Sequence, residues 1–232
     1  MSADEMNSSR RKFLANVAGS ATALAAVGLS STALRAQGAA ATAPQGGWDM
    51  TWLDKVAKAK HKQVFDAPAM ADGMALTNAA VWLNGYSEVY KTTDADMAAV
   101  IVFRHKGVTA VLNDELWSIL KPTDDDKAKD PAAADVVVTR NPFLTPKAGE
   151  RGGNLMPNGS MDALISRGMI VIGCNLALMR QAGPLSKALG ISREEAQQKL
   201  IAGLVPGVIR MPSGVFATTR AEEAGCGFLR ST

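Results

Sequence analysis

Apolar residues along the chain follow two patterns, short continuous runs and longer stretches with helical spacing. Continuous runs with β-branched members are typical of strands that are buried on both faces of a sheet. Apolar positions that recur every three or four residues are typical of amphipathic helices. The predicted strands are 61–65, where residues alternate, and 98–105, 169–173, 207–211 and 226–229. The predicted helices are 52–59, 71–90, 114–120, 161–167, 174–183, 192–202 and 215–224. Because strands alternate with helices throughout, the sequence predicts a doubly wound α/β domain with a parallel sheet of about five strands.

Residues at the ends of three predicted helices fit helix-capping preferences. Thr51 stands directly before 52–59 and is predicted to cap that helix. Ser192 and Glu195 have the spacing of a capping box at the start of a helix. Gly225 follows the last predicted helix, where glycine is favoured because the chain often turns left-handed.

The amino-terminal segment has the features of an export signal. The motif Ser-Arg-Arg-Lys-Phe-Leu at 9–14 has the paired arginines, the aromatic residue and the leucine of a twin-arginine signal, and a weakly apolar run follows at 14–29. This run is rich in small residues and interrupted by Asn16, which makes it too short and too mildly hydrophobic for a permanent membrane span. We therefore expect a signal peptide at 1–41, cleavage near its end and a periplasmic protein. The alternative is a retained amino-terminal anchor.

Composition excludes some partners of the remaining chain, 42–232. Residues 1–41 contain four basic and two acidic residues, so the formal net charge falls from +3 to +1 when they are removed. No cluster of lysines and arginines and no basic segment with interleaved aromatic residues remains, which argues against nucleic acid as a partner. We expect a single domain, since a chain of about 190 residues buries roughly 70% of its unfolded surface. We also expect no stable membrane span after the signal peptide is removed.

The segment 121–158 interrupts the alternation of strands and helices and is predicted to be an insertion. It contains an acidic run, several prolines and a glycine-rich stretch, and only 135–139, with three consecutive valines, has an ordered pattern. Loops of this length serve as lids or partner-binding elements, or are solvated insertions. Within it, the Arg-Asn-Pro-Phe sequence at 140–143 is a candidate docking element, because an exposed phenylalanine beside an arginine is poorly suited to a disordered tail.

The candidate chemistry centres on Cys174. This residue follows the apolar run 169–173 and precedes a helical pattern, so we place it at the carboxyl end of a central strand, where α/β proteins collect ligands and reactive groups. A thiol at the start of a helix also feels the positive end of the helix dipole, which favours the reactive thiolate. The alternative is a small buried core residue. His105 ends another predicted strand and Arg180 lies further along the helix; both are candidates for proton transfer or anion binding.

Cys226 is predicted to be a packed core residue. It begins a predicted strand, whereas Cys174 ends one, and in parallel strands these positions lie at opposite ends of the sheet, roughly 15 Å apart. A disulfide requires Cα atoms within about 7 Å of each other. We therefore expect two unpaired thiols.

Three segments carry a resemblance to a known family. They are 169–183, with the strand, the cysteine and a helix that ends in glycine; 102–107, with a strand and its turn; and 213–228, near the carboxyl terminus. These segments resemble the DsrE/DsrF-like family of sulfur-oxidation and sulfur-relay proteins, which have a flavodoxin-like, three-layer α/β/α fold. The resemblance implies that Cys174 carries sulfane sulfur as a persulfide and hands it to a partner. It also implies a homo- or hetero-oligomer. The export signal, the insertion and the single candidate thiol are departures from the better-known members.

Three functions are consistent with these features. The first is an exported sulfur carrier or sulfurtransferase-like protein that exchanges sulfur with a donor or acceptor protein or with a small sulfur compound. The second is a binding module for a metal or another small ligand that uses Cys174, His105 and methionines, although no Met-x-x-Met, Cys-x-x-Cys or histidine-rich motif is present. The third is a non-catalytic interaction partner that docks through 140–143.

The sequence contains no motif that identifies a cofactor. A nucleotide-binding glycine motif and a Gly-x-Ser-x-Gly elbow are both absent, which disfavours NAD, ATP and serine hydrolase chemistry. Flavin stays open, because flavodoxin-like folds bind FMN on loops without a strong motif. Whether the protein turns over a substrate also stays open.

Overall fold

The structure is a computed structural model of the chain, and residues 47–120, 140–147 and 155–232 are described. The chain divides into two units, Met1–Pro44 and Gln45–Thr232, and all described residues belong to the second. The predicted signal peptide at 1–41 and the valine-rich segment at 135–139 lie outside the described residues.

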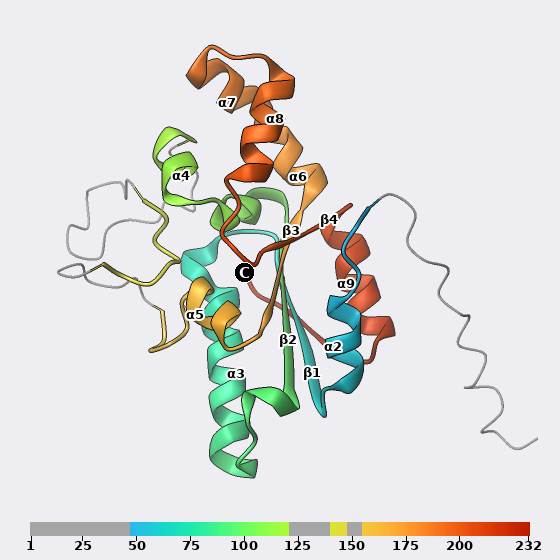
Figure 1. The fold of residues 1–232 in the computed structure, drawn as a ribbon. Coiled ribbons are helices and arrows are strands. Elements are labelled where there is room, and N and C mark those ends of the chain that lie inside the picture. The colour runs from blue at the N-terminus through green and yellow to red at the C-terminus, as the bar shows by residue number, and fades with distance from the viewer. Residues whose placement is uncertain (1–46, 121–139, 148–154) are drawn as a thin grey trace, which may run out of the picture. The chain divides into compact units, whose positions relative to one another are not determined.

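Five parallel strands form one sheet at the centre of the described unit (Figure 1). In chain order they are β1 His61–Ala67, β2 Met97–Phe103, β3 Ile170–Cys174, β4 Ile209–Met211 and β5 Gly227–Arg230. Their order across the sheet is β4-β3-β2-β1-β5, and every neighbouring pair is parallel. β2 and β3 are buried along their whole length, as expected for continuous apolar runs that are covered on both faces. The predicted parallel sheet is confirmed.

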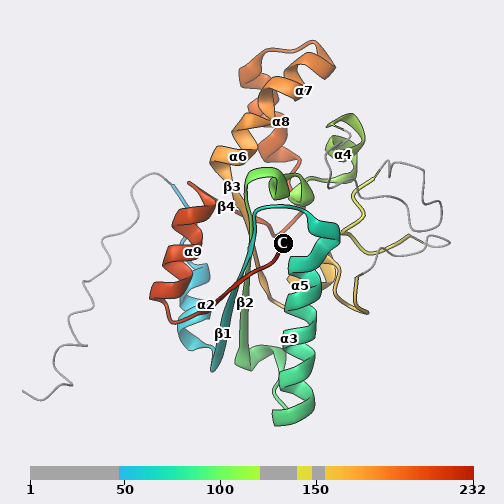
Figure 2. The same cartoon turned by 180° about the vertical axis from the view of Figure 1, so that it is seen from behind.

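Helices cover both faces of the sheet and complete the three-layer, flavodoxin-like α/β/α arrangement that we expected (Figures 1 and 2). They are α2 Trp52–Lys58, α3 Met74–Tyr90, α4 Asp114–Leu120, α5 Met161–Ser166, α6 Asn175–Arg180, α7 Ala182–Leu189, α8 Arg193–Ala202 and α9 Gly214–Glu223. One apolar core joins the sheet to α3 through α8, and a second joins the opposite face to α2 and α9. None of the helices in the described part of the chain has the length and apolar character needed to cross a membrane.

The change of face between these helices follows from right-handed crossover connections. From β1 to β4, each strand is added on the same side of its predecessor, and the connecting helices α3 to α8 contribute to one core. The chain then returns across the sheet to place β5 beside β1, and the connecting helix α9 packs on the other face. A right-handed connection that reverses its direction must also change face, so α9 leaves β4 on the opposite side from α6.

Several element ends differ by a few residues from the sequence-based expectation, and two differences concern the surroundings of the site. The second strand ends at Phe103 rather than at residue 105, so His105 lies in the 3-10 helix η3 (His105–Val111). The helix α7 was not predicted as a separate element. It contains Gly183 and Pro184, two poor helix formers that obscure its apolar pattern.

The predicted helix caps are confirmed in part. Thr51 does not cap α2 with its side chain, because its hydroxyl donates a hydrogen bond to Asp49 instead. The capping box of α8 is complete: the Ser192 hydroxyl accepts the Glu195 backbone N–H at 3.1 Å, and the Glu195 carboxylate accepts the Ser192 N–H at 2.9 Å. Gly225 adopts a left-handed conformation after α9, with φ +95°.

The segment 140–143 is part of the folded core. The buried side-chain amide of Asn141 donates to the carbonyl oxygens of Ala110 and Leu112 at 2.7 and 2.6 Å. The Phe143 ring packs edge-on against Trp117, with the ring centroids 5.8 Å apart, and Phe143 is 3% exposed. The expectation of an exposed, docking phenylalanine is therefore wrong: the ring fills the core beside η3 and α4.

Candidate functional site

The change of face after β4 creates a topological switch point between β3 and β4. The helix α6 leaves the end of β3 and packs into the same core as α3, whereas α9 leaves β4 on the opposite face. In parallel α/β sheets, ligands bind outside the carboxyl ends of the strands at such a point. Cys174 is paired with Met211 in the register of these two strands. The structure thus places the predicted reactive thiol at the switch point.

Cys174 is a free thiol that is 5% exposed. It is the last residue of β3 and the residue directly before α6, and its backbone is extended, with φ −71° and ψ 112°. The thiol therefore lies at the amino end of α6, a helix of only six residues.

Arg104 supplies a full positive charge at the same end of the sheet. It follows β2, and its Nε and Nη2 atoms donate to the two carboxylate oxygens of Asp66 at 2.6 and 2.7 Å. Asp66 belongs to β1 and is only 2% exposed, so this two-point contact fixes the guanidinium against a buried anchor.

Arg104 lies within electrostatic range of both Asp66 and Cys174. The pKa of Arg104 is raised, chiefly by its hydrogen bonds to Asp66. Burial acts against this shift, and the charges of Asp66 and of Cys174 add to it.

The amino end of α9 packs directly on Arg104. Ser213 caps this helix, and its hydroxyl oxygen accepts the Phe216 backbone N–H at 3.0 Å. Gly214 is the first helical residue, and a Cβ atom there would lie 2.6 Å from the Cβ of Arg104. Real side chains do not approach so closely, so glycine is needed for α9 to reach Arg104. The close approach brings the positive end of a ten-residue helix to the same site.

A second arginine, Arg210, lies on β4. Its Nη1 donates to the Asn175 side-chain oxygen at 2.9 Å, and its guanidinium carbon lies 4.8 Å from the centroid of the Trp48 ring. No described carboxylate forms an ion pair with Arg210. Asn175 directly follows Cys174, so this hydrogen bond ties the start of α6 to the neighbouring strand.

The other two predicted site residues are less closely associated with the thiol. His105 lies at the carboxyl end of the sheet, as expected, but its side chain is exposed and makes no hydrogen bond to another described residue. Its φ of +48° is left-handed, which turns the chain out of β2 into η3. Arg180 is exposed and ends α6, so the whole helix separates it from Cys174.

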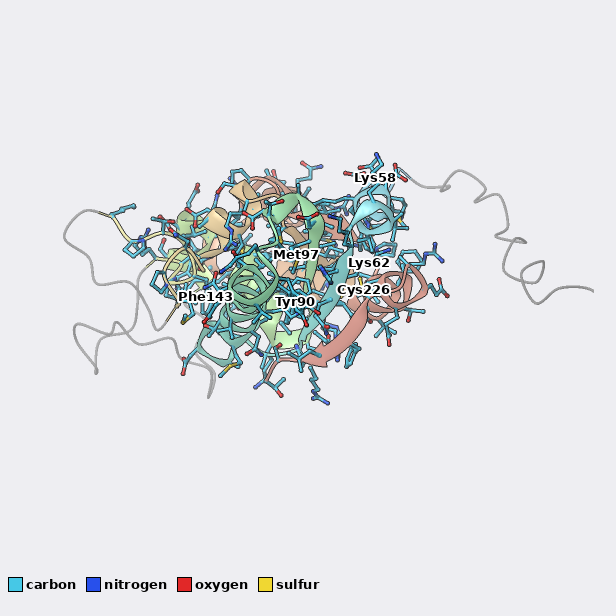
Figure 3. The ribbon with its side chains drawn as sticks, turned by 90° about the horizontal axis from the view of Figure 1, so that it is seen from below. Lys58, Lys62, Tyr90, Met97, Phe143 and Cys226 are labelled. Carbon is cyan, nitrogen blue, oxygen red and sulfur yellow. The ribbon has the colours of Figure 1, made fainter. Side chains whose placement is uncertain are left out.

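Cys226 lies at the amino end of the sheet. It precedes β5, and two strands separate β5 from β3. Both cysteines are unpaired, as predicted. Burial raises the pKa of the Cys226 thiol to about 11; the charge of Lys62 opposes this shift and that of Glu222 adds to it. Figure 3, which views the molecule from this end, shows Cys226 beside Lys62.

The comparisons with known proteins leave the site to be interpreted from its own geometry. No protein family model matches the chain, and no curated protein matches it in sequence. Within the described ranges, no three His, Cys, Asp or Glu side chains are grouped so that they could hold a metal ion.

The sequence-based reasoning missed Asp66, Arg104 and Gly214. Asp66 carried a usable signal, because a carboxylate directly after an apolar pair in a predicted strand requires a buried partner. Arg104, next to the last residue of the predicted strand 98–105, was the natural choice. Gly214 gave no comparable signal, since its role depends on how closely α9 approaches β2 in the folded protein.

Proposed function

We propose that this protein is an exported sulfur carrier of the sulfurtransferase type, in which Cys174 accepts sulfane sulfur as a persulfide. The observation that supports this most directly is that a free thiol at the switch point lies within electrostatic range of the Arg104 guanidinium. The motif at 9–14 supports a periplasmic location. The resemblance of 102–107, 169–183 and 213–228 to sulfur-relay proteins supports sulfur as the cargo.

The proposed loading step is a nucleophilic displacement at sulfur. Cys174 loses its proton to solvent, and its thiolate attacks the outer sulfur of a donor hydropersulfide, R–S–SH. A bond forms between the Cys174 Sγ atom and this sulfur, the S–S bond of the donor breaks, and the donor leaves as the thiolate R–S⁻. Cys174 is then a persulfide, and no electrons are gained or lost overall. In the release step, an acceptor thiolate attacks the outer sulfur and Cys174 leaves as a thiolate.

Arg104 and Asp66 have distinct parts in this chemistry. In the proposed reaction Cys174 carries a negative charge before loading and again after release, and we assign to the Arg104 guanidinium the role of stabilising that charge. Asp66 acts as a positioning residue, because it holds the guanidinium in place through two hydrogen bonds. The low exposure of Cys174 restricts access to its Sγ atom, which protects a bound persulfide from oxidants and favours small donors.

Intact-mass measurement after incubation with glutathione hydropersulfide tests the proposal. We expect the parent protein to gain one sulfur atom, Cys174→Ser to gain none, and Cys226→Ser to gain one as the parent does. Cys226→Ser is the matched control, because it removes the other buried thiol of the described residues. Sulfur on Cys174→Ser, or sulfur mapped to Cys226 in the parent, would contradict the assignment.

A second candidate function is the binding of a small anion without sulfur transfer, and Arg210 favours it. Its guanidinium is held by Asn175 and Trp48, and no described carboxylate neutralises it. A fixed guanidinium of this kind binds oxyanions well. This function replaces the first if the parent gains no sulfur but binds sulfate by calorimetry and Arg210→Gln weakens that binding.

A further inference from the structure

Strand β5 is an open edge of the sheet. It is the last strand in the order across the sheet and pairs only with β1, and all four of its residues are exposed. Phe228 is 49% exposed and Leu229 is 42% exposed. Edge strands are usually protected by proline, by lysine or by a covering element, because their unpaired backbone groups attract other strands. Gly227–Arg230 contains neither residue type, and Figure 3 shows no described element beyond β5.

At the opposite edge of the sheet, contacts within the chain hold a side chain of the last strand. There, Trp48 stacks on Arg210 of β4, and Asn175 binds the same guanidinium. All four residues of β5, by contrast, are exposed at an open edge, which is the feature of a strand that can pair again.

The hydrogen bonds of β5 show which backbone groups remain available. The Ser231 N–H donates to the carbonyl oxygen of Asp66 at 2.8 Å, so the backbone groups of Ser231 point toward β1. Successive residues of a strand direct their N–H and C=O groups to alternate sides, so the N–H and C=O groups of Leu229 also point toward β1. The N–H and C=O groups of Phe228 and Arg230 therefore point away from the sheet.

The side chains of β5 divide between the two faces. Phe228 is paired with Val64 and Arg230 with Asp66 in the register with β1, so these two side chains share one face. Leu229 is paired with Phe65 and lies on the face that α3 covers.

We infer that β5 pairs in antiparallel orientation with β5 of a second copy of this chain. The two-fold axis passes beside Leu229, so that Phe228 lies opposite Arg230 of the partner subunit. This register satisfies the outward groups of Phe228 and Arg230 in both copies, because each such pair exchanges two backbone hydrogen bonds. It joins the two sheets into one continuous sheet.

The side chains fit the same register on both faces. On one face, each Arg230 guanidinium lies beside the ring of Phe228 of the partner subunit, a favourable cation–π arrangement that occurs twice. On the other face, Leu229 meets Leu229 of the partner subunit at the two-fold axis, in the pair type that brings side chains closest. Antiparallel pairing with a second copy produces both matches from the residues of β5 alone, which is why a second copy is the occupant that we infer.

The surface beside β5 extends the interface. The Asn78 side-chain amide of α3 donates to the Ser231 hydroxyl at 3.1 Å, which places this part of α3 next to the end of β5. Val81, one turn further along α3, is 51% exposed. Stable interfaces bury roughly 800 Å² per partner, more than a four-residue strand supplies, so the contact has to include α3.

A cysteine cross-link tests this register. In an antiparallel pair without backbone hydrogen bonds, the two Cα atoms lie about 4.5 Å apart, within the range of a disulfide. We therefore expect Leu229→Cys to form an intermolecular disulfide with itself under mild oxidation. Val215→Cys, a substitution at a similarly exposed apolar residue of α9, is the control that should not cross-link.

The mass of the unmodified protein in solution gives the second measurement. Light scattering during gel filtration should give twice the mass of one chain for the parent, and Leu229→Asp should return it to the monomer mass by placing two carboxylates at the axis. A monomeric parent would overturn the inference. A dimeric parent in which Leu229→Cys cross-links no better than Val215→Cys would also overturn it, because the copies would then meet elsewhere.

Discussion

The two cysteines of this protein occupy similar depths in the molecule but lie beside opposite ends of their neighbouring helices. Cys174 is 5% exposed and Cys226 is 8% exposed. Cys174 lies before the amino end of α6 and interacts with Arg104. Cys226 lies after the carboxyl end of α9, where the helix dipole is negative, and its backbone N–H binds the carbonyl oxygen of Ala221.

This difference teaches that burial alone does not decide the chemistry of a thiol. At Cys226, desolvation dominates and the thiol stays protonated, with a pKa of about 11. At Cys174, the neighbouring cation is Arg104, which two hydrogen bonds to Asp66 hold in place. The order of strands and helices produces this difference. The end of a strand that precedes a helix lies at the amino end of that helix, and the beginning of a strand that follows a helix lies near its carboxyl end.

The largest expected effect comes from removing the charge at Arg104. Arg104→Gln leaves the Asp66 carboxylate buried without its partner, and breaking a buried ion pair in this way costs about 3–5 kcal/mol of unfolding free energy. Urea unfolding measures this loss. We also expect slower alkylation of Cys174 at neutral pH, because its thiolate loses a stabilising charge.

The double variant Asp66→Asn with Arg104→Gln separates stability from reactivity. Two neutral amides of similar shape can hydrogen-bond to each other, so much of the lost stability should return. The alkylation rate of Cys174 should stay low, because the positive charge is still missing. A double variant that regains both stability and reactivity would show that Arg104 acts on Cys174 only through the fold.

A smaller effect is expected where α9 meets Arg104. Gly214→Ala places a Cβ atom 2.6 Å from the Cβ of Arg104, so the helix or the arginine must shift. Overpacking of this kind costs about 1–3 kcal/mol. Displacement of Arg104 should also lower the rate of sulfur loading at Cys174.

Gly183→Ala is the matched control for this substitution. Gly183 lies in α7 and a Cβ atom there would meet nothing within 4 Å, so alanine should stabilise the protein by up to about 1 kcal/mol through its helix propensity. Thermal unfolding of the two variants measures both changes. Equal shifts in the same direction would contradict the close packing of α9 on Arg104.

The sequence predicts the scaffold of this site better than its details. Continuous apolar runs identify β2 and β3, since strands that are buried on both faces have no polar alternation. The alternation of strands and helices then predicts parallel pairing, and parallel pairing predicts that Cys174 and Cys226 lie apart. These inferences depend on local patterns and on general rules of topology, and both are readable in one chain.

The contacts that give the site its charge depend on tertiary structure. Asp66 and Arg104 lie far apart in the sequence and meet because β1 pairs with β2. The segment 140–143 has the composition of a surface loop, but Asn141 anchors this loop to η3, and the Phe143 ring lies in the core. The contacts of Asn141 have no local sequence pattern, which is why the prediction for 140–143 failed.

The smallest expected effect at neutral pH comes from Cys226. Cys226→Ala removes one buried sulfur and should cost about 1 kcal/mol of unfolding free energy, with sulfur loading at Cys174 unchanged. The folded thiol has a pKa of about 11, above the value of about 8.5 for an unfolded thiol.

The sign of the pH dependence follows from this raised pKa. Below about pH 8 the Cys226 thiol is protonated in both the folded and the unfolded state, and its contribution to stability is complete. Between about pH 8 and pH 11 the thiol ionises in the unfolded state first, which lowers the stability of the folded state. The parent should therefore lose stability relative to Cys226→Ala when urea unfolding is repeated at about pH 10. If the stability difference between the parent and Cys226→Ala stays constant with pH, the Cys226 thiol ionises as readily in the folded protein as in the unfolded chain. The difference between the surroundings of the two cysteines would then depend on Arg104 alone.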